Sequence, residues 1–526
     1  MAENSTGSKF FGPFDLAVVL VLSISVVSLA LLAANVFDPW RALGIAFPLS
    51  LALLFFLRVK HYRFRFRMDL SSLGLVALLL FTALLRLDTY PWTGGGQDQG
   101  VYVNMATYFQ QHGQILPLDH IRESLPDELK KLYDLSNYEK SAPINRVENK
   151  REGNYLPGVF VADGERSQLV FQFYHLHPLW MSIFGELFGG ENRGYSLLLF
   201  ALLSVAAFYF LALELTGSGR AALICGVLIA LNPLHAFFTR FPVTEVMALA
   251  FSSLAVLYLL RYYRQSQGQR LHPAWLLVSA AAFGCLFFTR ISGFMFVPIL
   301  CLLLFVIELY VSERQLRGQL RTYIFAVLAL YALSVVYGLT YSYPYAAGIY
   351  EKSFSRALGA QWRSALPLAA CAALLGYGLA LILREGYKAS ALSGHVSAAR
   401  RYLVFLFPLA LLPGLYKVYH RGFVETGGDR WGISGTGMEV MLHWSPVVLF
   451  QHLSPFFLLL FVYVLWKTRE RLSDGLTLLL VFLLMFWTYI SYLQWVIPYQ
   501  YYYARYLLSE VLPYTLLFTV AGLFRI

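Results

Sequence analysis

Long apolar runs separated by short polar connections recur along the whole chain. About fourteen of these runs have roughly 16 to 22 residues, the length that a helix needs to cross the hydrocarbon core of a bilayer. They centre near Val21, Leu51, Leu78, Leu203, Val227, Leu254, Ala281, Leu302, Leu330, Leu374, Leu409, Leu459, Leu480 and Thr515. The pattern predicts an all-α polytopic membrane protein with about fourteen transmembrane helices.

Composition supports the same class, because 58% of the 526 residues are hydrophobic and only 13% are charged. The first apolar run, Leu16 to Ala34, lacks a clear cleavage signal, so we interpret it as a retained span and not as a signal peptide. All four cysteines (Cys225, Cys285, Cys301 and Cys371) fall inside apolar runs, which predicts small core residues and not a disulfide framework.

The net charge of +11 is explained by topology. The basic run from Arg58 to Arg67 joins the second and third predicted spans, and the positive-inside rule places it in the cytoplasm. Alternate loops that are rich in Lys or Arg then fall on the same side: Arg261 to Arg270, Arg314 to Arg321, Arg384 to Arg401 and Lys467 to Arg471. We expect a multi-pass plasma (inner) membrane protein with both termini cytoplasmic.

The opposite, extracytoplasmic side receives the long segment from Asp88 to about Gly190. Within it, Glu123 to Leu135 predicts a charged surface helix. Tyr155 to Val161 and Gln168 to Tyr174 flank an Asp-Gly pair, a pattern typical of a β-hairpin. The segment is therefore predicted to form a small α+β loop subdomain. The chain contains no P-loop or GxGxxG pattern, so nucleotide hydrolysis is unsupported, and no nucleic-acid partner is expected.

Asp98 follows the glycine run Gly94 to Gly96, where the chain first leaves the bilayer after the third span. Glycines let the backbone approach a ligand closely. Val101 to Gln111 predicts a helix in the membrane interface with Val101, Met105, Tyr108 and Phe109 along one side. The carboxylate of Asp98 is either a functional group or the N-cap of that helix.

Ordered motifs along the chain resemble the GT-C glycosyltransferases, most closely the branch with protein O-mannosyltransferases and lipid A aminoarabinose transferases. The resemblance covers roughly Arg86 to Tyr506, but Gln99 follows Asp98 where family members usually carry a second acidic residue, and two spans precede the usual first one. The matching elements are Arg86, Asp98 and Tyr102; His175-Leu176-His177-Pro178-Leu179; Arg240 to Glu245; Thr289-Arg290; and Arg505-Tyr506.

The resemblance implies three regions. Residues 1–68 form an N-terminal two-helix hairpin with a basic cytoplasmic loop, residues 69–345 form the GT-C-like catalytic core including extracytoplasmic loop 88–190, and residues 346–526 form C-terminal transmembrane helices with extracytoplasmic loops. It also implies a glycosyltransferase that moves a sugar from a polyprenyl-phosphate donor to an acceptor hydroxyl on a glycan, lipid or protein. A secondary transporter or flippase of lipid-linked saccharides is the rival class, although carriers tend to place their charges near the membrane midplane.

The implied chemistry needs a base and a phosphate-binding group. Asp98 is the candidate base. Glu245 is the second acidic residue that the resemblance implies is catalytic. Arginine suits a phosphate because its fixed fork of donors can hold two oxygens. The candidates for donor or substrate binding are Arg290, Arg505, Arg240, Tyr102, His175, His177 and Tyr506. No cofactor is expected and no metal site is assigned, with a divalent metal kept as an alternative.

Each candidate also has a purely structural interpretation. Glu245 begins a span, where a carboxylate favourably meets the helix dipole. Arg290 and Arg505 can act as interfacial anchors, and Arg240 can pair with Glu245. His175 and His177 can make structural hydrogen bonds, contact the acceptor or the donor phosphate, or ligate a metal. The late loop Glu425 to Gly432 mixes charge, glycine and Trp, which suits sugar stacking or a mobile lid.

Overall fold

The computed structural model describes the chain in segments. They are residues 10–59, 63–64, 69–88, 97–138, 154–156, 158–163, 166–266, 273–311, 313–343, 345–358, 375–379, 381, 401–407, 409, 452–493 and 504–526. The glycine run Gly94 to Gly96, the loop Glu425 to Gly432 and Cys371 lie outside these segments.

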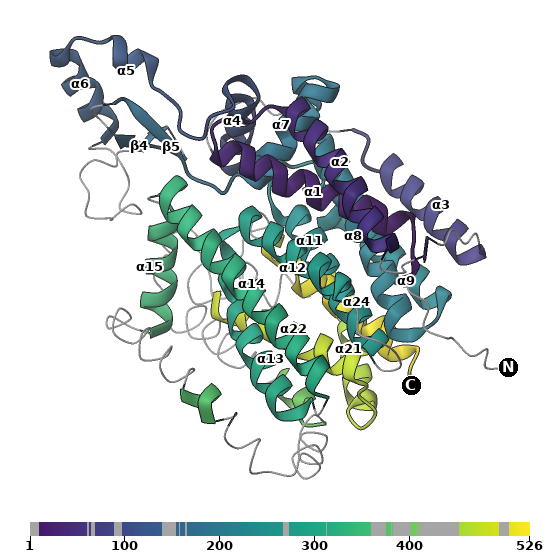
Figure 1. Cartoon of the computed structure of the whole chain (residues 1–526). Coiled ribbons are helices and arrows are strands. Elements are labelled where there is room, and N and C mark those ends of the chain that lie inside the picture. The colour runs from purple at the N-terminus through teal and green to yellow at the C-terminus, as the bar shows by residue number, and fades with distance from the viewer. Residues whose placement is uncertain are drawn as a thin grey trace.

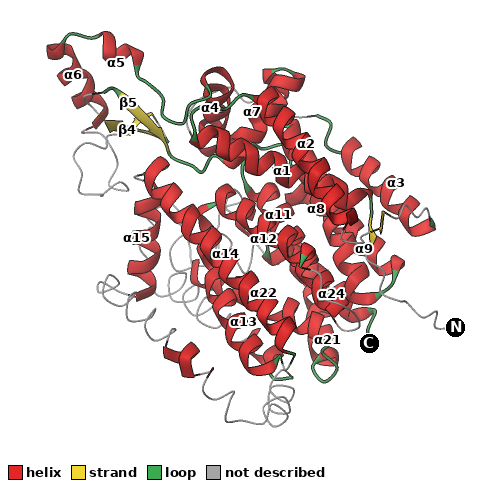
Figure 2. Ribbon diagram, in the orientation of Figure 1, coloured by secondary structure: helices red, strands yellow, loops and turns green. Residues whose placement is uncertain are grey.

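Helices make up nearly all of the described architecture (Figures 1 and 2). In the first half they are α1 (Pro13–Ala33), α2 (Pro39–Val59), α3 (Leu70–Leu84), α4 (Gln97–His112), α5 (His120–Ser124), α6 (Asp127–Tyr138), α7 (Leu176–Phe188), α8 (Tyr195–Thr216), α9 (Gly219–Ala230), α10 (Pro233–Phe238) and α11 (Glu245–Ser266). In the second half they are α12 (Ala274–Thr289), α13 (Phe296–Tyr310), α14 (Arg314–Tyr341), α15 (Tyr345–Leu358), α21 (Pro455–Thr468), α22 (Asp474–Leu493), α23 (Arg505–Leu508) and α24 (Val511–Leu523), with short 3₁₀ turns η2 (Gly190–Asn192), η3 (Ile291–Met295) and η4 (Leu403–Phe405).

Seven described helical segments are long and apolar enough to span a membrane, and five shorter apolar helices accompany them. Each of these segments contains one of the predicted centres. The two remaining centres, near Leu374 and Leu409, have most of their neighbouring residues outside the described segments. The chain is therefore an all-α polytopic membrane protein, and the number of about fourteen spans stays a prediction.

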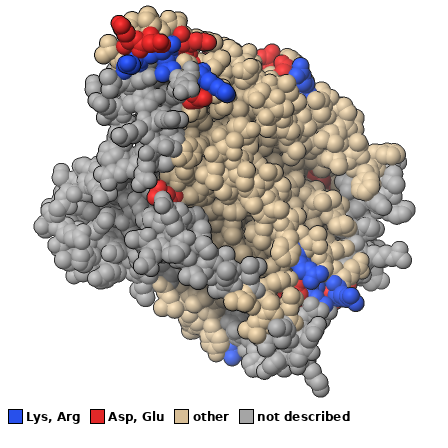
Figure 3. Space-filling view, turned by 60° about the vertical axis from the view of Figure 1, so that its left-hand side comes forward, with Lys and Arg blue, Asp and Glu red and all other residues tan. Residues whose placement is uncertain are grey.

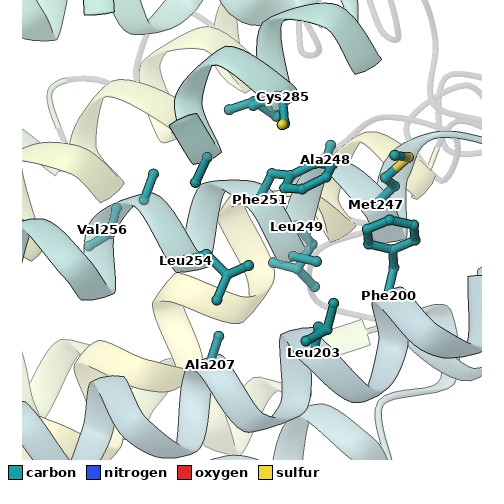
Figure 4. Close-up of a cluster of buried hydrophobic side chains, with 14 of the residues drawn as sticks. Phe200, Leu203, Ala207, Met247, Ala248, Leu249, Phe251, Leu254, Val256 and Cys285 are labelled. Carbon is teal, nitrogen blue, oxygen red and sulfur yellow. The ribbon is translucent and has the colours of Figure 1, made fainter. Parts of the chain in front are cut away.

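The centre of the bundle is formed by α8, α11 and α12, which pack closely against one another. Figure 4 shows Phe200 and Leu203 of α8 facing Phe251 and Leu254 of α11, with Cys285 of α12 on the other side of α11. All five side chains are buried. Alanines such as Ala248, Ala250 and Ala255 lie along α11, and small residues allow neighbouring helices to approach closely within a bilayer.

Helices α1, α2, α3, α4 and α7 lie around this centre. α1 and α2 form an N-terminal hairpin that packs on α7 and α12, and α3 packs on α8 and α9.

α4 packs along α7, which buries Val101, Met105 and Phe109. The predicted helix Val101 to Gln111 is thus confirmed, but it begins earlier, at Gln97. Asp98 therefore lies inside the first turn, and its prediction as the residue immediately before the helix is wrong.

The segment between α4 and α7 extends away from the helical bundle (Figure 1). The predicted hairpin is confirmed by the antiparallel strands β4 (Val159–Asp163) and β5 (Gln168–Phe171), in the register Phe160 to Val170. A third strand, β3 (Asn154–Leu156), pairs with β4, so the predicted strand from Tyr155 to Val161 is divided in two. The predicted helix Glu123 to Leu135 is also divided into α5 and α6, because Pro126 cannot continue a helix from the preceding turn.

The hydrophobic composition is visible on the outside of the molecule. Most of the described surface in Figure 3 consists of uncharged residues. The charged side chains gather in a few patches. Large apolar side chains are exposed along α2, including Phe47, Phe55 and Phe56. Such a surface is expected of helices that face lipid. At the far end of this hairpin, β1 (Phe10–Phe11) pairs with β2 (Arg63–Phe64) in parallel.

Candidate active site

Asp98 meets Arg505 across the bundle. The Nη2 group of Arg505 donates a hydrogen bond of 2.6 Å to Oδ2 of Asp98. The Arg505 side chain is only 6% exposed, whereas that of Asp98 is 31% exposed. A short, charge-assisted contact of this kind fixes both groups strongly. The fold thus joins two candidate residues that lie near opposite ends of the chain.

Glu245 lies beside Arg505 as well, and it comes from a third element. It begins α11, and its Oε1 atom lies 3.4 Å from Nε of Arg505 and 3.9 Å from Nη2 of Arg290. The Glu245 side chain is only 3% exposed. A buried carboxylate needs compensating charge, which the two arginines supply. The position also agrees with the predicted interaction with the positive end of the helix dipole.

Arg290 reaches the same place because α12 ends at Thr289 and the backbone turns sharply there. Arg290 is the C-cap of α12 in an extended conformation, and the 3₁₀ turn η3 follows at once. Its Nη1 group donates to Oγ of Ser509 at 2.8 Å. Its guanidinium lies 5.1 Å from the ring centroid of Tyr506, and that of Arg505 lies 5.0 Å from the same ring. Tyr506 therefore lies in contact with both arginines.

Ser509 and Glu510 belong to this cluster, and sequence reasoning missed them. They lie between α23 and α24, inside a segment that otherwise reads as one apolar span. Both are buried, and the Ser509 hydroxyl donates to Oε2 of Glu510. An ionisable residue within a span is itself a signal of a functional site. The cluster then contains the carboxylates of Asp98, Glu245 and Glu510 and the guanidinium groups of Arg290 and Arg505.

Aromatic side chains form the wall next to Asp98. Tyr102, one turn along α4, stacks on Phe173 with a centroid distance of 4.6 Å, and His177 meets the Tyr102 ring edge-on at 4.9 Å. Burial, with a further contribution from Asp98, raises the pKa of Tyr102 well above its ordinary value. Tyr345, which sequence reasoning also missed, packs edge-on against Phe173 at 5.3 Å. Tyr102 and Phe173 are each only 6% exposed, so these rings pack mainly on one another.

His177 differs from His175 in what surrounds it. Within the described segments, neither ring nitrogen of the fully buried His177 has a hydrogen-bond partner. His175 instead shares a hydrogen bond of 2.5 Å between Nδ1 and Oη of Tyr337, and its ring packs on Phe109. Burial lowers the pKa of each histidine to about 3, so both are neutral at physiological pH. The structure thus brings His177 to the aromatic wall and holds His175 in a structural contact.

Arg240 lies in a different group, around the fully buried Arg86. Arg86 donates from Nη2 to the Ala230 carbonyl at 2.6 Å and to Nδ1 of His235 at 2.8 Å. Arg240 donates to the Leu85 carbonyl. Burial, followed by the charge of Arg240, lowers the pKa of Arg86 to about 10, which leaves it charged at neutral pH. These contacts tie the end of α3 to the connection that leads into Glu245.

No three His, Cys, Asp or Glu side chains in the described part of the chain are placed to hold a metal ion.

Comparisons with known proteins give one family match and several similar structures. Residues 191–350 match the family model described as dolichyl-phosphate-mannose-protein mannosyltransferase. A comparison with curated proteins found no match. The oligosaccharyltransferase AglB of Archaeoglobus fulgidus, in complex with an inhibitory peptide and a dolichol-phosphate, is similar with a TM-score of 0.44 and 17% identity over 85% of this chain and 50% of that one.

The Archaeoglobus fulgidus oligosaccharyltransferase tethered to an acceptor peptide has a TM-score of 0.48 and 16% identity, over 86% of this chain. The match covers 49% of that structure, so the chain spans about half the length of the solved structures it resembles.

Proposed function

We propose that this chain, which the family match supports as a membrane glycosyltransferase of the GT-C superfamily, transfers a sugar from a polyprenyl-phosphate donor to an acceptor hydroxyl. One observation carries the proposal. The carboxylates of Asp98 and Glu245 and the guanidinium groups of Arg290 and Arg505 come from four separate elements and meet in one cluster. This is the combination of proton acceptors and phosphate-binding groups that the reaction requires.

Asp98 is the proposed base. The acceptor oxygen attacks the anomeric carbon while the bond from that carbon to the phosphate oxygen breaks. The hydroxyl proton passes to Asp98, and the polyprenyl phosphate leaves with the bonding electron pair. General base catalysis of this kind contributes about 10² to 10⁴-fold in rate. A single displacement inverts the anomeric configuration and needs no covalent enzyme intermediate.

Arg505 and Arg290 are the proposed phosphate-binding groups. In the structure Arg505 holds Asp98, and both arginines lie near Glu245. A donor phosphate would compete for the Arg505 fork, because phosphate oxygens are strong acceptors for a guanidinium. Its binding would release Asp98 to accept a proton, while Glu245 keeps the arginines oriented. This exchange would order the reaction, with the donor bound before the acceptor is activated.

The remaining features complete the proposal. We place the reaction on the extracytoplasmic face of a plasma (inner) membrane, with both termini in the cytoplasm, because the basic loops alternate along the sequence. Tyr102, Tyr506 and His177 would contact the sugar or the acceptor, and the lipid tail of the donor would lie among the spans. Arg240 and His175 would support the site through their neighbours and not by direct contact.

Transfer from a panel of radiolabelled polyprenyl-phosphate sugars by the purified protein tests the proposal. Wild-type protein should transfer one of these sugars, and Asp98→Asn should reduce turnover by about 10² to 10⁴-fold. Asp163→Asn removes a carboxylate from the exposed hairpin and should leave turnover unchanged. Folded wild-type protein that consumes none of the donors, or an Asp98→Asn protein with full turnover, would contradict the proposal.

A further inference from the structure

The N-terminal hairpin α1–α2 contacts the residues that directly follow α4, the helix that carries Asp98. We propose that this hairpin is a positioning element: it fixes the C-terminal end of α4 and thereby sets where Asp98 stands against Arg505. The inference rests on the proposed function, because it assigns the hairpin a part in the same reaction. Three sets of contacts carry it.

The first contact joins the turn between α1 and α2 to the end of α4. The backbone N–H of Phe37 donates to the Gly113 carbonyl at 3.1 Å, and the N–H of Ile115 donates to Oδ1 of Asn35 at 3.0 Å. Both turning residues have left-handed backbones, with φ of 55° at Asn35 and 63° at Gly113. A Cβ atom at Gly113 would collide with the Phe37 carbonyl. The turn between α1 and α2 and the end of α4 therefore fit together only with glycine at position 113.

The second contact passes through Glu186 of α7. Nε1 of Trp40 in α2 donates to Oε1 of Glu186 at 3.2 Å, and Nε2 of Gln110 in α4 donates to Oε2 at 2.8 Å. Arg193 then donates to Oε1 of Gln110 at 2.8 Å. One carboxylate thus links the hairpin to the last turn of α4.

The third contact lies deeper in the bundle. Nε1 of Trp180 in α7 donates to Oγ of Ser25 in α1 at 3.0 Å. On the same helix, Ser182 donates to the Ala106 carbonyl of α4 at 2.8 Å. The hairpin therefore holds α7, and α7 holds α4, at a point between the turn and Asp98.

The length of α4 explains why its far end matters. Sixteen residues separate Gln97 from His112 inclusive, so the helix is about 24 Å long. A tilt of about 5° around one end of a helix of this length moves the other end by about 2 Å. A displacement of about 1 Å at a reacting group can cost about 10²-fold in rate. A contact that stops the tilt consequently acts on the chemistry without touching the substrate.

The substitution Gly113→Ala tests the inference, with Gly217→Ala as its matched control. Both glycines close a helix in the left-handed region, but nothing lies within 4 Å of a Cβ atom at Gly217. Both variants should therefore lose stability through backbone strain, whereas only Gly113→Ala pushes the hairpin away from α4. We expect turnover at saturating donor to fall by about tenfold or more in Gly113→Ala, with the KM for the donor changed by less than about threefold.

Asn35 provides a second, milder pair of variants. Asn35→Gly keeps the left-handed backbone but removes the acceptor for the Ile115 N–H, whereas Asn35→Asp keeps an acceptor oxygen. Turnover should fall in Asn35→Gly, whereas Asn35→Asp should keep a turnover close to that of the wild type. Hydrogen exchange of the amides in residues 97–112 gives a readout that does not depend on activity, and it should speed up in Gly113→Ala and Asn35→Gly only.

The outcomes separate this inference from the proposed function. Wild-type protein without transfer activity would overturn the proposed function, and the exchange data would still show whether the hairpin orders α4. Active wild-type protein with equal turnover and equal exchange in Gly113→Ala and Gly217→Ala would overturn the positioning role alone.

Discussion

At the scale of single residues, Arg505 is the centre of the candidate site. Its guanidinium contacts Asp98, lies near Glu245, and donates at 3.2 Å to the hydroxyl of Tyr506. A planar fork can serve several acceptors at fixed angles, which an ammonium group cannot do. The geometry therefore depends on the shape of the side chain as well as on its charge.

The substitution Arg505→Lys should show this dependence. Lysine keeps the positive charge but cannot reach Asp98 and Glu245 in the same fixed geometry, so we expect turnover to fall by about tenfold or more. Steady-state transfer measurements check this, with Arg525→Lys near the C-terminus as a control that should keep wild-type turnover. Equal turnover in both variants would show that charge alone is sufficient at position 505.

At the scale of elements, two histidines at the start of α7 contribute to how the fold responds to acid. His175 and His177 are fully buried, and burial lowers the pKa of each to about 3 from an ordinary value of 6.5. In the unfolded chain they bind protons below pH 6.5, whereas in the folded chain they bind them only near pH 3. The unfolded state therefore binds more protons between these values, and the free energy of unfolding falls as the pH falls through that window.

Thermal unfolding in detergent at a series of pH values checks this. Each buried histidine contributes a loss of about 1.4 kcal/mol per pH unit below its ordinary pKa. His177→Gln should therefore weaken the fall of Tm between about pH 6.5 and pH 5. His120→Gln, at a side chain that is 75% exposed, should keep the wild-type slope. A slope unchanged by His177→Gln would contradict the burial of a neutral histidine there.

At the scale of the whole molecule, a buried ionic contact fixes the other end of the N-terminal hairpin. Nη1 of Arg261 in α11 lies 2.5 Å from Oδ1 of Asp15 in α1, and the Tyr258 hydroxyl donates to the same oxygen at 2.6 Å. The Arg261 guanidinium also lies 5.9 Å from the ring centroid of Trp275. The hairpin is thus attached to the core at both ends of α1.

Removing one partner of this contact should destabilise the fold. Asp15→Asn removes the more deeply buried of the two carboxylates that compensate the Arg261 charge, and only Glu214, at 3.3 Å from Nε of Arg261, then remains, so Tm should fall. Glu214→Gln should lower Tm by less, because Glu214 is 26% exposed and Arg261 keeps Asp15. The double substitution Asp15→Leu with Arg261→Met should recover part of the loss, since it removes both charges. A Tm equal to wild type in Asp15→Asn would contradict the attachment.

The sequence predicted much of the candidate site because ionisable residues at the ends of apolar runs are rare and their order along the chain resembles a known family. Asp98, Glu245, Arg290 and Arg505 were all named from that pattern, and the structure places them together. Ser509 and Glu510 were missed because they fall within what reads as a continuous apolar span. Tyr345 was missed because a tyrosine near a span end is ordinarily part of an aromatic belt.

The sequence by itself determined the fold class, an all-α polytopic membrane protein, since the hydrocarbon core of a bilayer requires about 20 apolar residues in a helix and leaves few alternatives for the backbone. Which helices become neighbours was decided only by the tertiary structure. The partner of Asp98 lies near the other end of the chain, and the N-terminal hairpin packs on α7 and α12. Such contacts depend on the shapes of helix surfaces and on the burial of single polar groups, and the periodicity of a sequence carries neither.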